Sequence, residues 1–446
     1  MRREAEEEVT DARRIVYETL LLAEESSQNT LVKDVLDKYS YLPSSDRSFI
    51  KRLTEGVTER RITLDHVIDI YSKIPVIKMK RQIRTLVRMG TYQLLYMDSV
   101  ADHAAVNETV KLARKTGFAA LSGFVNGVLR NIARNRDGIS WPNPDKDPVK
   151  YLSVMYSCPE WIVKKLIDEA GRDNAESLLE LSVSVRPVTA RVNLSKTSVK
   201  AVEAEGNAKA SDVLSSAVVL SDYDNIADIP AFNEGRICIQ DISSMLVCLV
   251  AGIQKGDTVL DLCAAPGGKS LHAADIAVNG KVISCDVSEK KLEKIRENVA
   301  RCGFSNIETR LSDASQYNDS FEGMADVVIA DVPCSGLGVM GRKNDIKYNL
   351  TEGSVISLVS LQRRILENAA RYVRPQGVLM FSTCTCSRAE NHDNFRFLAD
   401  ECHLKPTGFY EVLPEKLRCD SAKEGYIQLY GRDCLTDGFF IGKFVK

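Results

Sequence analysis

From about residue 241 onward, short apolar runs alternate with helical stretches, and this alternation constrains the fold more than any other feature. The apolar runs are TVLDLC, KVISCDV, IETRLSD, ADVVIADV and GVLMFSTC, and the longest helical patterns are SEKKLEKIRENVARCG and SVISLVSLQRRILENAARYV. Such alternation predicts a doubly wound, parallel α/β sheet with right-handed crossovers. Because sheets of this kind bind ligands outside the carboxyl ends of their strands, the residues at those ends are the candidates for a functional site.

The rest of the chain differs in character and predicts a multidomain protein. Residues 1–136 show helical periodicity without strand-like alternation, residues 137–150 (DGISWPNPDKDPVK) have the composition of a linker, and residues 151–240 mix helical and strand patterns. We therefore expect an all-α domain at 1–136, a linker at 137–150, a small α+β module at 151–240 and a Rossmann-like domain at 241–446.

Charge is distributed unevenly along the chain. The net charge is −2, yet residues 51–140 hold 16 Lys and Arg against 8 Asp and Glu. This local excess, which includes Arg81 and Arg84, predicts either a solvated helical surface or a nucleic-acid footprint. Arg342, Lys343 and Lys347 are further candidates for phosphate contacts, with a solvated loop as the alternative.

Composition limits the compartment and the metal chemistry. The chain has no apolar run long enough to span a membrane, and its start (MRREAEEEVTDARR) is too charged for a signal peptide, so we expect a cytoplasmic protein with no membrane partner, monomeric by default. Twelve cysteines are present, but no C-x-x-C spacing occurs. Zinc-ribbon and thioredoxin-like sites are therefore disfavoured, and no metal site is predicted.

The first three strand ends favour a nucleoside-bearing cofactor. The loop DLCAAPGGK (261–269) has small residues that let a ligand approach the backbone closely, but it matches neither the dinucleotide fingerprint nor the P-loop. Asp286 ends the second strand, where a carboxylate can accept from ribose hydroxyls, and Asp313 ends the third, where it can accept from an adenine amino group. An ordinary tight turn for the loop, and helix or turn capping for the two aspartates, are the structural alternatives.

Two cysteines and a carboxylate follow the next two strands. Asp331 and Cys334 lie at the end of the fourth strand, and Cys384 ends the fifth, with Cys386 two residues later. Taken alone, Cys384 and Cys386 could be a metal clip, a redox pair, two buried thiols, or a nucleophile beside a bystander. The shared sheet edge instead predicts that Cys384 works with Cys334, unless two thiols at neighbouring strand ends are a coincidence.

These motifs resemble a known family. DLCAAPGGK, ADVPCSGLG, and STC followed by AEN are similar to the motifs of the RNA cytosine-C5 methyltransferases of the NOL1/NOP2/Sun family. The first 136 residues resemble the antitermination factor NusB, through DRSFIKRLTEGVTERRITLDHVI, RMGTYQLLYM and the stretch from HAAVNETVKLARKTG to FVNGVLRNI. A NusB-like domain joined to such a catalytic domain is the layout of bacterial 16S rRNA methyltransferases, and the resemblance is weakest at 195–230.

The resemblance implies a cofactor, a reaction and a set of site residues. It implies S-adenosylmethionine held by Cys263, Ala264, Ala265, Pro266, Gly267, Gly268, Lys269, Asp286, Asp313 and Asp331. It implies Cys384 as the nucleophile and Cys334 as the group that assists proton removal and product release, while Asp331 is the best-placed acid for cytosine N3. The implied substrate is cytosine 967 of 16S rRNA, free or in a small-subunit assembly intermediate, and the implied RNA-recognition-like fold covers 151–240.

The chain departs from the family pattern at three places; those at Cys158 and Asn344 do not touch the proposed chemistry, although the second can alter a substrate-facing loop. Cys158 stands where the family often has His, Asn344 where it usually has Pro, and Cys386 where it usually has an aliphatic residue, which predicts a packing role for Cys386. A tRNA cytosine-C5 methyltransferase is an alternative that the NusB-like domain disfavours. A non-catalytic RNA-binding or antitermination factor is another, disfavoured because both cysteines and CAAPGGK are intact.

Overall fold

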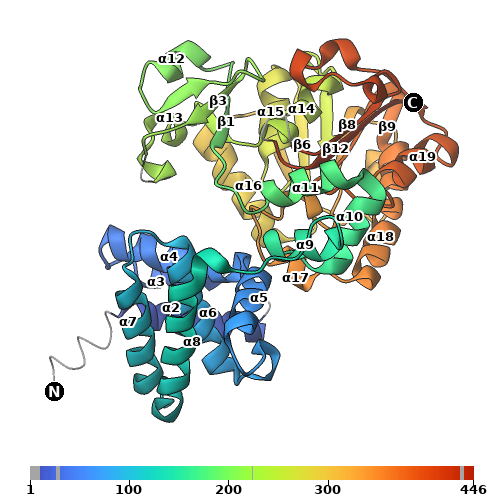
Figure 1. Ribbon diagram of the computed structural model, residues 1–446. Coiled ribbons are helices and arrows are strands. Elements are labelled where there is room, and N and C mark those ends of the chain that lie inside the picture. The colour runs from blue at the N-terminus through green and yellow to red at the C-terminus, as the bar shows by residue number, and fades with distance from the viewer. Residues whose placement is uncertain (1–10, 27–30, 224, 432–435) are drawn as a thin grey trace. The chain divides into compact units, whose positions relative to one another are not determined.

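The computed structural model describes residues 11–26, 31–223, 225–431 and 436–446 of the chain (Figure 1). Residues 1–10 lie outside the described part. They include most of the charged start of the chain, on which the expectation of no signal peptide rests. Two compact units make up the chain. Unit 1 is Met1–Ile167 together with Met340–Asn349, and unit 2 is Asp168–Val339 together with Leu350–Lys446.

Unit 1 is helical. Its α-helices are α2 (Ala12–Ser26), α3 (Leu31–Lys38), α4 (Ser44–Glu59), α5 (Arg61–Tyr71), α6 (Arg81–Tyr96), α7 (Asp102–Lys115), α8 (Ser122–Asn135), α9 (Pro148–Met155), the first part of α10 (Glu160–Ala170) and α17 (Ile346–Asn349). The central helix α6 packs closely against α8, since a Cβ on Gly90 would come within 2.5 Å of the Leu129 side chain. Glycine at this position therefore permits the close approach of two buried helices.

The segment Met340–Asn349 joins unit 1 from far along the sequence. Its Lys347 ammonium donates to the backbone carbonyl of Glu59 at 2.9 Å, and the Tyr348 hydroxyl donates to the same carbonyl at 3.2 Å. This grouping differs from the four-part division by sequence, which placed 340–349 with the Rossmann-like domain and began a separate module at residue 151. The predicted domain boundaries therefore stay a prediction.

A small antiparallel sheet occupies the start of unit 2. Its strands are β1 (Val188–Val192), β2 (Ala208–Ala210), β3 (Ala217–Leu220) and β4 (Ile237–Ile239), in the order β2-β3-β1-β4. Around it are α11 (Arg172–Leu181), α12 (Val199–Glu203) and α13 (Pro230–Asn233). Arg191 of β1 is fully buried and pairs with Asp275 at 3.2 Å, and Asp275 also accepts from the backbone amides of Leu194 and Ser195. This carboxylate ties the small sheet to the helix that follows the CAAPGGK loop.

The larger sheet carries the strand ends identified in the sequence. Its strands are β5 (Thr258–Asp261), β6 (Lys281–Asp286), β7 (Ile307–Leu311), β8 (Ala325–Asp331), β9 (Val373–Thr383), β10 (Lys405–Pro406), β11 (Tyr426–Leu429) and β12 (Phe439–Val445). The order is β10-β12-β9-β8-β5-β6-β7, with β11 paired to β12, and the strands from β9 to β7 are parallel. Its helices are α14 (Ile242–Ala251), α15 (Gly268–Ile276), α16 (Glu289–Cys302), α18 (Glu352–Tyr372) and α19 (His392–Asp400).

Helices cover both faces of this sheet, as Figure 1 shows. One apolar core packs residues of α14 and α15 against the strands, and another packs residues of α18 and α19 against their opposite face. The sheet is mixed rather than wholly parallel, because β10, β11 and β12 pair antiparallel at one edge. The predicted succession of an all-α region, a small α+β module and a Rossmann-like domain is otherwise confirmed.

Candidate active site

Two neighbouring parallel strands bring Cys334 and Cys384 together. In the β8–β9 register Asp331 lies opposite Ser382, so the loop after β8 and the end of β9 meet at the same sheet edge. The two sulfur atoms are 3.4 Å apart. The strand pattern alone predicted that these two cysteines meet, although they are 50 positions apart in the sequence.

The environment keeps the Cys334 thiol protonated. Its contact with Cys384, its burial, and the nearby charges of Glu390 and Asp331 raise the pKa of Cys334 well above the ordinary value. A neutral thiol at this distance can donate its hydrogen to the Cys384 sulfur. The surroundings of Cys334 therefore favour its protonated form.

Asp331 is held on both carboxylate oxygens. The Lys269 ammonium lies 2.7 Å from Oδ2, and the Ser382 hydroxyl donates to Oδ1 at 2.7 Å. Burial alone would lower the pKa of Lys269, but the charge and hydrogen bond of Asp331 outweigh it, and the pKa is raised. Lys269 therefore carries a charge and is bound to Asp331 by a short, charge-assisted contact. The role of Asp331 as the acid for cytosine N3 stays a prediction.

The CAAPGGK loop runs from the end of β5 to the start of α15. Gly267, at a φ of +104°, takes the left-handed conformation directly before the helix, which an L-residue rarely adopts. The Ala264 amide donates to the carbonyl of Cys285 at 2.9 Å, which fixes the loop against β6. Cys263, Ala265, Pro266 and Gly268 are part of the same turn, so the predicted loop residues do lie together.

The two further cofactor candidates differ in exposure. Asp286, at the end of β6, is 5% exposed and pairs with Lys291 at 3.4 Å, while the amides of Ala265 and Ser288 approach its carboxylate. Asp313 is exposed, and its Oδ1 accepts from the amide and hydroxyl of Ser315 at 2.9 and 2.7 Å. Asp313 thus caps a turn, which was the structural alternative to a cofactor contact. Its other carboxylate oxygen, Oδ2, is left for a ligand.

The donor set fits S-adenosylmethionine. Asp261, Asp286, Asp313 and Asp331 all lie at or just after the carboxyl ends of adjacent parallel strands. Asp261 is buried, its Oδ1 has no hydrogen-bond partner among the described residues, and burial raises the pKa of this carboxyl to about 6. A cluster of carboxylates with a spare acceptor suits a cofactor that carries a sulfonium, an ammonium and ribose hydroxyls.

A buried polar network holds the Cys334 loop. Glu390 is fully buried, and its carboxylate accepts from the Ser335 amide at 2.8 Å, from the Ser335 hydroxyl at 2.5 Å and from Gln362 at 3.0 Å. Gln362 also donates to the carbonyl of Pro333 at 2.9 Å. The residues on both sides of Cys334 are therefore anchored. Sequence reasoning noted the AEN triplet only as part of the resemblance, and its spacing gave no sign of this role.

A second set of contacts fixes the backbone after Cys384. Asn391 donates to the carbonyl of Thr385 at 2.9 Å and accepts from the hydroxyl of Thr383. Thr385 and Ser335 share a hydrogen bond of 2.7 Å between their hydroxyls, which links this set to the Cys334 loop. Both thiols are thus positioned by one continuous network.

Cys386 is separate from this pair. It is 4% exposed, its sulfur lies 3.4 Å from the Gln428 amide nitrogen, and burial raises its pKa. These contacts agree with the packing role inferred for Cys386. The described residues contain no group of three or more His, Cys, Asp or Glu that could hold a metal ion.

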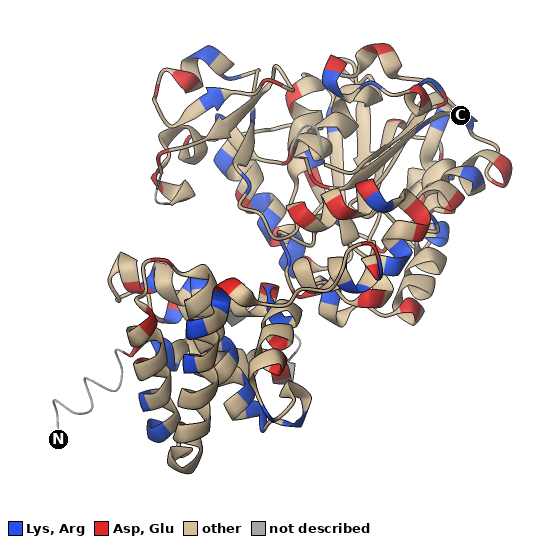
Figure 2. Cartoon of the chain, viewed as in Figure 1, with Lys and Arg blue, Asp and Glu red and all other residues tan. Residues whose placement is uncertain are grey.

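The five candidate RNA contacts fall into different environments. Arg342 and Lys343 are exposed and Arg81 is half-buried, whereas Arg84 pairs with Glu24 at 3.2 Å. Lys347 is 1% exposed, its ammonium is bound to the Glu59 carbonyl, and burial lowers its pKa to about 8. It therefore presents no charge to a phosphate, and the expectation for Lys347 is corrected. In unit 1, Lys and Arg are spread over several helices (Figure 2).

Known families match both halves of the chain. The family described as 16S rRNA methyltransferase RsmB/F matches residues 248–445, and the NusB family matches residues 10–134. In the described residues no helix is long and apolar enough to cross a membrane.

Full-length relatives and solved structures extend this likeness. The probable ribosomal RNA small subunit methyltransferase B of Bacillus subtilis is 35% identical, over 97% of this chain and 98% of that protein. The ribosomal RNA small subunit methyltransferase B of Vibrio cholerae is 28% identical, over 90% of each. The crystal structure of PH0851 has the same fold, with a TM-score of 0.77 at 24% identity over 98% of each chain. That of NSun6 from Pyrococcus horikoshii with SFG has a TM-score of 0.57 at 22% identity, over 65% of this chain and 98% of that one.

The chain therefore belongs to the RsmB/F family of S-adenosylmethionine-dependent rRNA methyltransferases. S-adenosylmethionine is the cofactor of this family.

Proposed function

We propose that this protein methylates C5 of a cytosine in 16S rRNA, at the position that the family implies, cytosine 967, through a covalent bond between Cys384 and C6. The observation that carries the proposal is the 3.4 Å contact between Cys334 and Cys384 beside Asp331. Cytosine C5 is a weak nucleophile, and addition of a thiolate to C6 makes it an enamine carbon. A single nucleophile needs no second thiol, so the pair favours separate roles for bond formation and product release.

Residues at the carboxyl ends of β5, β6 and β8 would hold the cofactor, which supplies an electrophilic methyl group when bound. Lys269 and Ser382 fix the Asp331 carboxylate at this edge. The target base must leave its stack to reach the two cysteines. Exclusion of water around the buried loop strengthens each polar contact made to that base.

The two cysteines exchange their protonation roles during the reaction. Cys384 attacks as the thiolate, and the electron pair of the C5–C6 double bond moves toward C5. Once its sulfur is bonded to C6, Cys384 no longer carries a charge or accepts a strong hydrogen bond, so its contribution to the raised pKa of Cys334 is lost. Cys334 then loses its proton to water. Its thiolate takes the proton from methylated C5, C5=C6 re-forms, and the Cys384 thiolate leaves.

Two variants test this division of roles. Cys384→Ala should abolish methyl transfer from labelled S-adenosylmethionine to unmethylated 16S rRNA, and full retained activity would refute the nucleophile assignment. Cys334→Ala should accumulate a protein–RNA adduct that migrates slowly on a denaturing gel. If the adduct accumulates with Cys384→Ala instead, the two roles are reversed.

Bisulfite sequencing of rRNA and tRNA from a deletion strain tests the substrate. Loss of one 5-methylcytosine from 16S rRNA alone supports the proposal. Loss from tRNA alone supports the tRNA alternative, and unchanged methylation of both supports the non-catalytic one.

A further inference from the structure

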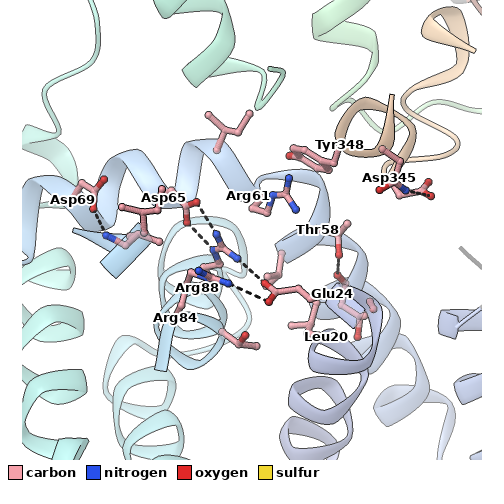
Figure 3. Close-up of a pocket in the computed structure, with 18 residues that line it drawn as sticks. Leu20, Glu24, Thr58, Arg61, Asp65, Asp69, Arg84, Arg88, Asp345 and Tyr348 are labelled. Carbon is pink, nitrogen blue, oxygen red and sulfur yellow. Dashed lines mark hydrogen bonds and ion pairs between the residues drawn. The ribbon is translucent and has the colours of Figure 1, made fainter. Parts of the chain in front are cut away.

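Unit 1 contains a cavity of about 620 Å³ to which no role has been given. Side chains of α2, α4, α5 and α6 line it together with Asp345, Tyr348 and Asn349 of the segment 340–349 (Figure 3). Its volume is in the range of small-molecule and nucleotide sites. The cavity lies wholly in unit 1 and shares no residue with the active site.

One side of the cavity is an ionic network in which each charged group has a partner of opposite charge, although Nε of Arg84 is buried without a hydrogen-bond partner among the described residues. The Arg88 guanidinium donates to both carboxylate oxygens of Asp65 at 2.7 Å and to Glu24 at 3.0 Å, and Arg84 pairs with the other oxygen of Glu24 (Figure 3). These charges cancel and hold α2, α5 and α6 in place. They form a rigid wall with little charge left over for a ligand.

Arg61 lines the same cavity but, unlike Arg84 and Arg88, has no carboxylate partner among the described residues. Its guanidinium lies 3.7 Å from the centre of the Tyr348 ring, and no described residue forms an ion pair or hydrogen bond with it. Hydrogen bonds of the Tyr348 hydroxyl with Ser157 and Glu59 fix that ring. Arg61 is therefore held over the Tyr348 ring with its N–H donors unused among the described residues.

Asp345 supplies the complementary group. Its Oδ2 accepts from Asn349 at 3.2 Å, but its Oδ1 is buried without a hydrogen-bond partner among the described residues. A buried acceptor without a partner costs free energy unless a ligand donates to it. The cavity thus combines a flat cationic stack, unused donors and an unused anionic acceptor.

We propose that this cavity takes one unstacked RNA base that carries an exocyclic amino group. Unpaired bases stack on aromatic rings and on guanidinium planes and are read along their edges. The Arg61 plane would stack on the base, and Asp345 would accept from its amino group. A phosphate fits less well, because three arginines line the cavity against four carboxylates, those of Glu24, Asp65, Asp69 and Asp345. The proposal rests on the proposed function only in taking RNA as the ligand.

Binding of short labelled RNAs to the full-length protein tests the proposal. Wild type should bind hexacytidylate more tightly than hexauridylate, because uracil lacks an amino group. Asp345→Ala should remove this preference. Arg61→Lys keeps the charge but loses the plane, and should weaken hexacytidylate binding about tenfold. Arg130→Lys, on an exposed residue of α8, is the matched control and should bind as wild type does. Wild-type-like binding by both Arg61→Lys and Asp345→Ala would overturn the proposal.

A second measurement needs no variant. Irradiation of wild type with a 5-iodocytidine hexamer should crosslink the tryptic peptide that begins at Tyr348, and crosslinks found only outside unit 1 would overturn the proposal. Methyl transfer to 16S rRNA is measured on the same preparations. If wild type transfers methyl and the variants bind normally, only the pocket is refuted. If wild type transfers none but the binding preference depends on Asp345, the proposed function fails and the pocket stands.

Discussion

Removal of the Glu390 carboxylate should release the loop that carries Cys334. Glu390→Ala deletes the acceptor of the Ser335 amide, the Ser335 hydroxyl and Gln362, all within a fully buried site. A hydrogen bond to a charged group contributes roughly 1.5–3 kcal/mol. Since about 1.4 kcal/mol corresponds to a factor of ten in an equilibrium constant, the Ser335 amide should exchange roughly 10- to 150-fold faster with solvent.

Hydrogen exchange read by mass spectrometry measures this change directly, without assuming that the whole chain unfolds in one step. Glu390→Gln keeps an acceptor for the Ser335 amide and should change its exchange only a few-fold. Glu401→Ala, on an exposed residue after α19, is the matched control. A folded Glu390→Ala protein whose Ser335 amide exchanges within twofold of wild type would refute the anchoring role.

Three further predictions concern other parts of the chain. Cys386→Ala should keep near-wild-type methyl transfer, because its sulfur contacts the Gln428 side chain and the Leu429 carbonyl and not the Cys334–Cys384 pair; loss of activity similar to that of Cys384→Ala would contradict the separation of the two cysteines. Lys347 has its folded pKa lowered by burial from 10.5 to about 8, so the unfolded chain binds more protons between these values, and stability should rise as pH increases through this window by on the order of 3 kcal/mol. Thermal unfolding from pH 7.5 to 10 should show this slope in wild type and not in Lys347→Met; equal slopes would count against it. Asp275→Ala should destabilise unit 2 by roughly 3–5 kcal/mol, because it leaves the buried Arg191 unpaired, and an unchanged urea midpoint would contradict this.

Features of the site that depend on strand direction and residue spacing could be predicted from the sequence. The meeting of Cys334 and Cys384 follows from two parallel strands that end at one sheet edge, and the CAAPGGK turn follows from its small residues. The antiparallel strands β10 and β11 were missed, since β10 has only two residues and β11 four, too short for a clear alternating pattern; β12, with seven residues, was also not predicted. Pairing partners were also missed: periodicity placed Arg84 among basic residues but could not show that Glu24 neutralises it.

The burial of individual polar side chains also could not be predicted from the sequence. Glu390 and Lys347 are of residue types that usually lie on the surface, and both are buried here because partners distant in sequence satisfy them. Nothing in the local pattern distinguishes them from exposed neighbours such as Lys343. Only the tertiary structure identifies these partners.

The placement of the segment 340–349 has a consequence for synthesis of the protein. Helices α2 to α9 leave the ribosome well before Lys347 and Tyr348. These two residues complete unit 1 by contacting the Glu59 carbonyl and the Arg61 guanidinium, respectively. At about 5–20 residues per second, the nascent helices wait roughly 10 to 40 s for this segment. During that interval the Glu59 carbonyl and the Arg61 face are accessible to other molecules. Completion of unit 1 therefore waits until β8 and the loop with Cys334 have been translated.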